Sequence, residues 1–160
     1  MAVHLDGRCV TIPFMNKRRI FITVIIALWL MLIWGHSMQP ATVSEHESGR
    51  VLAFLGKLFP ALLTSENGMF IVRKAAHITE FLILGILLTV GFLDRIYDRF
   101  ARFAIPALTG LFVAFIDETI QLFVVGRSGE VRDIWIDFSG VILGTLIALA
   151  FSNGRRSRRR

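Results

Sequence analysis

Four long apolar stretches occupy most of the sequence, at residues 20–34, 70–93, 104–125 and 131–151. A helix needs about 20 mostly apolar residues to cross a bilayer, and each stretch reaches about that length with its flanks. Hydrophobic residues make up 54% of the chain, whereas soluble domains typically contain roughly 45–50%. We therefore predict an all-α, polytopic membrane protein built on a bundle of four transmembrane helices.

The first stretch follows Lys17, Arg18 and Arg19, and a basic start with an apolar middle is also typical of a signal peptide. The residues between it and Pro40 contain no Ala-x-Ala cleavage site. We therefore interpret it as a transmembrane helix that ends before Pro40. Met15 directly precedes the basic residues in the manner of a translation start, so both Met1 and Met15 stay open as the true start.

Residues 41–68 are less apolar than the four stretches. Apolar residues recur there at helical spacing while charged residues occupy other faces. This pattern predicts an amphipathic helix that lies in the membrane interface between the first and second spans, too polar to cross. Ser48 is the expected N-cap, and Pro60 is expected to kink or end the helix.

The lysines and arginines predict an orientation. Most of the 18 lie in residues 1–19, in the loop 95–102 and in the last six residues. Because cytoplasmic flanks are enriched in basic residues, we expect a cell-membrane protein with both termini in the cytoplasm. Its expected parts are a cytoplasmic N-terminal tail (1–17), a four-helix domain (18–152) and a basic cytoplasmic tail (153–160). The arginine run beside a span suits anionic lipid headgroups, so we expect membrane lipids and no nucleic acid as partners.

Polar and ionisable residues inside the spans gather at one level of this predicted bundle. They begin the second and fourth spans and end the third, so alternating directions place all of them in the outer half. An ionised residue at the bilayer centre costs at least about 2.5–3.5 kcal/mol, so these groups must pair, take up protons or line water. The set is Arg73, Lys74, His77, Glu80, Asp117, Glu118, Gln121, Asp133 and Asp137.

Helical spacing allows these residues to meet. The members on each span are three or four residues apart and therefore share a face. Gly140 and Gly144 continue the face of Asp137, and small residues at that spacing allow another helix to approach closely. We predict a polar pocket that opens outward, with Arg127 and Arg132 at its mouth. These arginines suit an anionic ligand such as a phosphate or carboxylate.

Two structural alternatives stay open at this point. In the first alternative, the whole set of charges forms a structural ion-pair network. In the second, His77 and the carboxylates bind a divalent metal, but their spacing matches no strong metal motif. Cys9 is the single cysteine and offers no zinc spacing. We therefore expect no metal and no cofactor.

Several motifs follow one another in the chain: K-x-x-H-x-x-E-F from Lys74, D-E-x-x-Q from Asp117, the pair Gly126-Arg127, and D-x-x-x-D-x-x-G from Asp133. Over residues 20–150 this pattern resembles the VanZ-like family. One departure is Asp137, where Asn is common in the family. The resemblance implies a bacterial inner-membrane protein of the cell envelope and an association with resistance to teicoplanin, an acylated glycopeptide.

Three functional interpretations follow. In the first and favoured one, the pocket binds or modulates an anionic lipid-linked envelope precursor or an acylated glycopeptide. The second is an intramembrane enzyme that uses His77 as a proton shuttle and Glu80, Glu118, Asp133 or Asp137 as acid and base. The third, a transporter or proton relay, is disfavoured because the predicted cytoplasmic half has almost no ionisable groups. The sequence leaves the ligand and the oligomeric state open.

Overall fold

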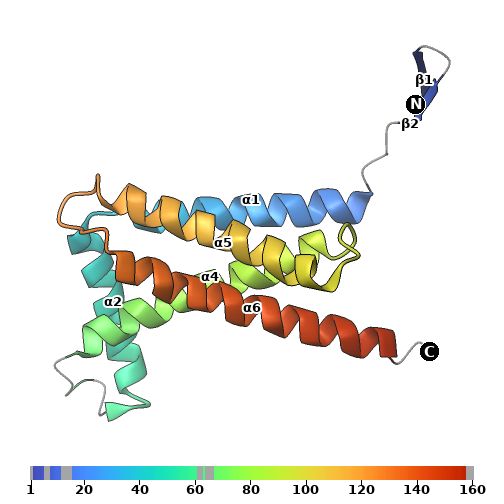
Figure 1. The fold of residues 1–160 in the computed structure, drawn as a ribbon. Helices are drawn as coiled ribbons and strands as arrows, with labels where there is room; N and C mark the ends of the chain where they lie inside the picture. The colour runs from blue at the N-terminus through green and yellow to red at the C-terminus, as the bar shows by residue number, and fades with distance from the viewer. Residues whose placement is uncertain (1, 6–7, 12–15, 61–62, 64–66, 158–160) are drawn as a thin grey trace.

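The computed structural model describes residues 2–5, 8–11, 16–60, 63 and 67–157 (Figure 1). Four of its helices are long and apolar enough to cross a membrane: α1 (Lys17–Ser37), α4 (Gly68–Phe92), α5 (Arg99–Gln121) and residues Val131–Ser152 of α6 (Val131–Ser157). The predicted all-α architecture with four potential membrane spans is thus confirmed. Two short antiparallel strands, β1 (Ala2–Leu5) and β2 (Arg8–Thr11), pair within the expected N-terminal tail.

The helix bounds lie close to those predicted, and the differences have local causes. α5 begins at Arg99, several residues before the predicted stretch, because the Asp98 side chain accepts a hydrogen bond from the Ala101 amide at 2.7 Å. Such a cap satisfies one of the free N–H groups of the first turn. α6 continues to Ser157 and so extends into the segment expected as a basic tail.

The amphipathic segment forms α2 (Ala41–Gly56), which turns away from α1 and contacts α4 (Figure 1). The helix begins directly after Pro40, so the prediction that Ser48 is its N-cap was wrong. It ends before Pro60 is reached. The Ala41 amide donates to the Val125 carbonyl at 3.3 Å, which ties the start of α2 to the loop between α5 and α6. The interfacial position of α2 stays a prediction.

α4 and α6 run parallel and pack closely against each other. A Cβ added at Gly140 would come within 2.5 Å of the Ile78 carbonyl oxygen, and one at Gly144 would overlap the carbonyl oxygen of Leu82. Gly85 makes the reciprocal approach to the backbone of Val141. The helices reach this separation only because glycine has no side chain, as the spacing of Gly140 and Gly144 predicted.

The exterior of the bundle is apolar and its interior holds charges, the reverse of a soluble protein. Large side chains such as Phe21, Met31 and Phe112 are 60–66% exposed. Asp117 and Asp137, by contrast, are at most 1% exposed. Exposed apolar surface of this kind suits contact with lipid, and buried charges are tolerated where they face the bundle interior.

Candidate functional site

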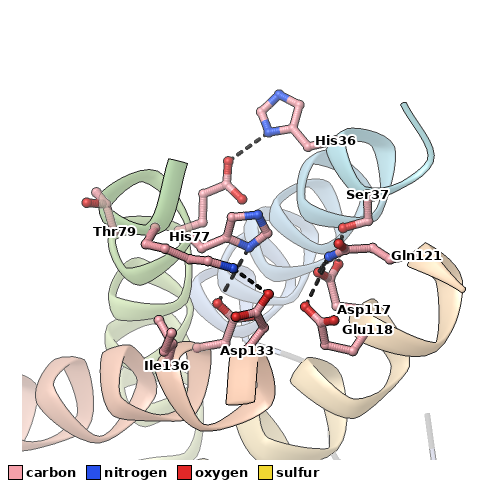
Figure 2. Close-up of polar contacts among 12 residues, drawn as sticks. His36, Ser37, His77, Thr79, Asp117, Glu118, Gln121, Asp133 and Ile136 are labelled. Carbon is pink, nitrogen blue, oxygen red and sulfur yellow. Dashed lines mark hydrogen bonds and ion pairs between the residues drawn. The ribbon is translucent and has the colours of Figure 1, made fainter. Parts of the chain in front are cut away.

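Polar side chains from four helices point toward one another at the end of the bundle where α1 and α5 end and α4 and α6 begin, here called the polar end (Figure 2). Because α4 and α6 run parallel, residues near the start of one meet residues near the start of the other. Lys74 donates to Oδ2 of Asp133. His77 Nδ1 lies 3.5 Å from Oδ1 of Asp137, a residue that is 1% exposed.

α5 contributes three buried residues that form one hydrogen-bonded group, Asp117, Glu118 and Gln121. The Gln121 amide nitrogen donates to Asp117 at 3.1 Å and to Glu118 at 3.2 Å. From α1, the Ser37 hydroxyl donates to Asp117 Oδ1 at 2.6 Å. The backbone N–H of Glu130 donates to Glu118 Oε2 at 3.0 Å. Both carboxylates are therefore held by neutral donors.

Glu80 takes a different direction from the other residues predicted on α4. Its carboxylate lies 2.7 Å from His36 Nδ1, and its backbone oxygen accepts from the Trp29 indole at 3.0 Å. Lys74 and His77 contact α6, whereas Glu80 turns toward α1. Glu80 and His36 line a cavity of about 200 Å³ together with His77 and Arg73.

A second cavity, here called the basic cavity, opens at the polar end with a volume of about 170 Å³. Ala41 and Ser44 of α2 line it, so α2 forms part of its wall. Its four basic side chains are Arg73, Lys74, Arg127 and Arg132, and its acidic ones are Glu130 and Asp133.

Among the described residues, no buried carboxylate forms an ion pair with Arg73 or Arg127. Lys74 pairs with Asp133, and Arg132 lies 3.1 Å from Glu130. Arg127 donates to the backbone oxygen of His36 at 3.1 Å, and Arg73 lies 3.6 Å from the exposed carboxylate of Glu45. Burial lowers the pKa of Arg127, and the positive charge of Arg73 lowers it further. Arg73 and Arg127 therefore oppose each other within one cavity.

Some buried polar atoms at the polar end have no hydrogen-bond partner within the described residues. They include Nε of Arg73, Oδ1 of Asp133 and Oδ2 of Asp137. A buried polar atom without a partner is costly, so each indicates a ligand-facing or strained position. One nitrogen of His77 and one carboxylate oxygen each of Asp117 and Asp137 also lie within 4.8 Å of one another.

The structure thus pairs Lys74 with Asp133 and His77 with Asp137. It joins Asp117, Glu118 and Gln121 in one hydrogen-bonded group. Arg127 and Arg132 line the same cavity as Lys74 and His77. Sequence reasoning missed the contacts of His36, Ser37 and Arg73. Their signal was position: His36 and Ser37 close the first span at the level where the other polar residues lie.

Comparison with known proteins identifies one family. The sequence model described as VanZ/LLP1 matches residues 21–152, which covers the four potential spans almost completely. No curated protein and no solved structure matches the chain.

Proposed function

The chain belongs to the VanZ/LLP1 family, and we propose that it binds a small anionic headgroup of a cell-envelope component in its basic cavity. The observation that carries this proposal is the pair Arg73 and Arg127. Both guanidinium groups line the cavity, and Nε of Arg73 is buried with no hydrogen-bond partner among the residues that the structure describes. A phosphate or carboxylate between them would accept hydrogen bonds from both planar forks and relieve their mutual repulsion.

The cavity size favours a headgroup over a whole antibiotic. Its volume of about 170 Å³ is smaller than the roughly 300–1,000 Å³ of pockets for drug-sized ligands. A phosphate fits such a space, and acyl chains of the same molecule would remain along the apolar helix surfaces. Binding of an acylated glycopeptide and resistance to teicoplanin therefore stay predictions of the family resemblance. A lipid-linked envelope precursor is the ligand class that we favour.

Binding of an alkyl phosphate tests this proposal. Purified protein in detergent is titrated with dodecyl phosphate, with dodecanol as the uncharged comparison and inorganic phosphate as the headgroup alone. Hydrogen bonds to charged groups contribute about 1.5–3 kcal/mol, so Arg73→Gln and Arg127→Gln should each weaken phosphate binding about 10- to 150-fold.

Arg95→Gln is the matched control, because Arg95 lies near the end of α4 and lines a cavity away from the polar end. It should bind like the wild type. Equal affinity for dodecyl phosphate and dodecanol, or unchanged affinity in both cavity variants, would contradict the proposal.

An enzyme acting on a lipid-linked substrate is the second candidate function. It is favoured by one observation: His77 lines the basic cavity and also contacts the buried carboxylate of Asp137. A histidine held by a carboxylate is a suitable proton donor and acceptor. Release of phosphate from dodecyl phosphate, lost in His77→Gln, would support this candidate. If the protein binds membrane-extracted phospholipids or alkyl phosphates but does not turn them over, the enzyme candidate is contradicted and the binding proposal remains.

A further inference from the structure

We propose that His77, Asp117 and Asp137 form a binding site for a divalent transition-metal ion such as Zn²⁺ or Mn²⁺. The three residues come from α4, α5 and α6, and their ligand atoms lie within 4.8 Å of one another. The proposal departs from the expectation that the protein binds no metal. That expectation rested on sequence spacing, which does not show ligands contributed by three separate helices.

The distance between His77 and Asp137 suits a shared metal better than a direct hydrogen bond. Nδ1 of His77 lies 3.5 Å from Oδ1 of Asp137, longer than the roughly 2.7–3.2 Å of N–H···O hydrogen bonds. Two ligands of a tetrahedral zinc ion, each about 2.0–2.1 Å from it, lie about 3.3–3.4 Å apart. Asp117 closes the triangle from α5, because one of its carboxylate oxygens lies within 4.8 Å of the ligand atoms of His77 and Asp137.

A second observation points to a ligand at Asp137. This side chain is 1% exposed, and its Oδ2 has no hydrogen-bond partner among the described residues. The His77 contact involves the other oxygen. A buried carboxylate oxygen without a donor needs either a proton or a cation, and a metal ion beside His77 would supply the cation.

The charge balance of the polar end supports a cation over a proton alone. Three carboxylates, Asp117, Glu118 and Asp137, are at most 4% exposed. In the part of the chain that the structure describes, no lysine or arginine forms an ion pair with any of them, and Lys74 is paired with Asp133. His77 supplies at most one positive charge to the group. A divalent ion would neutralise the negative charge of the carboxylates that His77 leaves uncompensated.

The surroundings hold the Asp117 carboxylate in place as metal sites require. The Ser37 hydroxyl donates to its Oδ1 at 2.6 Å, and the Gln121 amide donates to its Oδ2 at 3.1 Å. Hydrogen-bonded partners of this kind orient ligands in metal sites. One imidazole and two carboxylates suit Zn²⁺ and Mn²⁺, and three protein ligands leave a position open. His77 also lines the basic cavity, so that position would lie beside the proposed anion site.

Metal content tests the proposal without any anionic ligand. Purified protein is stripped with a chelator, dialysed against Zn²⁺ or Mn²⁺ in phosphate-free buffer, and measured by inductively coupled plasma mass spectrometry. The wild type should retain one ion per chain, and Asp137→Asn should lose it. Glu80→Gln is the matched control, since Glu80 is an intramembrane carboxylate of the same region outside the three-residue group. It should retain the ion.

A measurement on the wild type alone covers the case in which Asp137→Asn fails to fold. Loading with Co²⁺ should produce visible absorption typical of a low-coordinate nitrogen and oxygen site, and saturating Zn²⁺ should raise the thermal unfolding temperature. A wild type that retains neither Zn²⁺ nor Mn²⁺ overturns the proposal, as does unchanged binding in a folded Asp137→Asn. Either result leaves the phosphate test with Arg73 and Arg127 variants unaffected, because the two assays share no ligand.

Discussion

Asp133 and Asp137 lie one turn apart on α6, yet their surroundings differ. Asp133 receives the Lys74 ammonium and lies 3.9 Å from Arg132. Asp137 is more deeply buried, and His77 is its contact. Asp133 therefore belongs to a charge pair that joins α4 to α6. Asp137 belongs to the candidate metal group. Two identical residues on one helix face thus have different contact partners.

Removing one member of the Lys74–Asp133 pair should destabilise the protein more than removing both. Their side chains are 16% and 13% exposed, so Lys74→Met leaves a largely buried carboxylate without its partner. Breaking such a pair typically costs about 3–5 kcal/mol, whereas replacing both members by apolar residues is often nearly neutral. Thermal unfolding in detergent should show a lower transition for Lys74→Met and a recovery in Lys74→Met/Asp133→Leu. A double variant less stable than the single one would refute this account.

The helices as elements were predictable because bilayer thickness sets the length of an apolar span. The polar level was predictable too, since alternating spans place the ends of α1 and α5 beside the starts of α4 and α6. The contact partners of the polar side chains were not predictable, because they depend on how each helix is rotated about its own axis. In α1 both the lipid-facing and the core-facing sides are apolar, so the sequence pattern does not reveal where His36 and Ser37 point.

Local turn chemistry explains the remaining differences. Proline is well suited to the start of a helix because it has no backbone N–H that would be left unpaired there. Accordingly, α2 begins directly after Pro40 rather than at Ser48. The pairing of β1 with β2, in which Leu5 lies opposite Arg8, was not predicted from the sequence.

Close approach of α4 and α6 should be sensitive to a single added methyl group. A Cβ at Gly144 would overlap the Leu82 carbonyl oxygen, which cannot move without shifting the helix. We expect Gly144→Ala to lower the stability by about 1–3 kcal/mol, the usual range for overpacking. Gly35→Ala is the control, because a Cβ at Gly35 meets nothing within 4 Å. Circular dichroism during heating measures both. Equal transitions in the two variants would show that the helices are not this close.

As a whole, the molecule concentrates its buried charges at one end of the bundle, and its function depends on which side of the membrane that end faces. The chain carries 18 lysines and arginines, and most lie in the flanks near the opposite end. The positive-inside rule therefore predicts that the basic cavity lies on the outer surface, where it would meet envelope components. The reverse orientation would offer the cavity to cytoplasmic anions instead.

Cysteine labelling in intact cells decides between these orientations. In a Cys9→Ser background, Ser128→Cys reports on the polar end and Tyr97→Cys on the opposite loop, and both positions are exposed. A membrane-impermeant maleimide should label Ser128→Cys directly and Tyr97→Cys only after permeabilisation. The reverse pattern would place the cavity in the cytoplasm and exclude an outer-surface envelope component as its ligand. The buried network and the metal test would be unaffected, because neither depends on the direction in which the bundle is inserted.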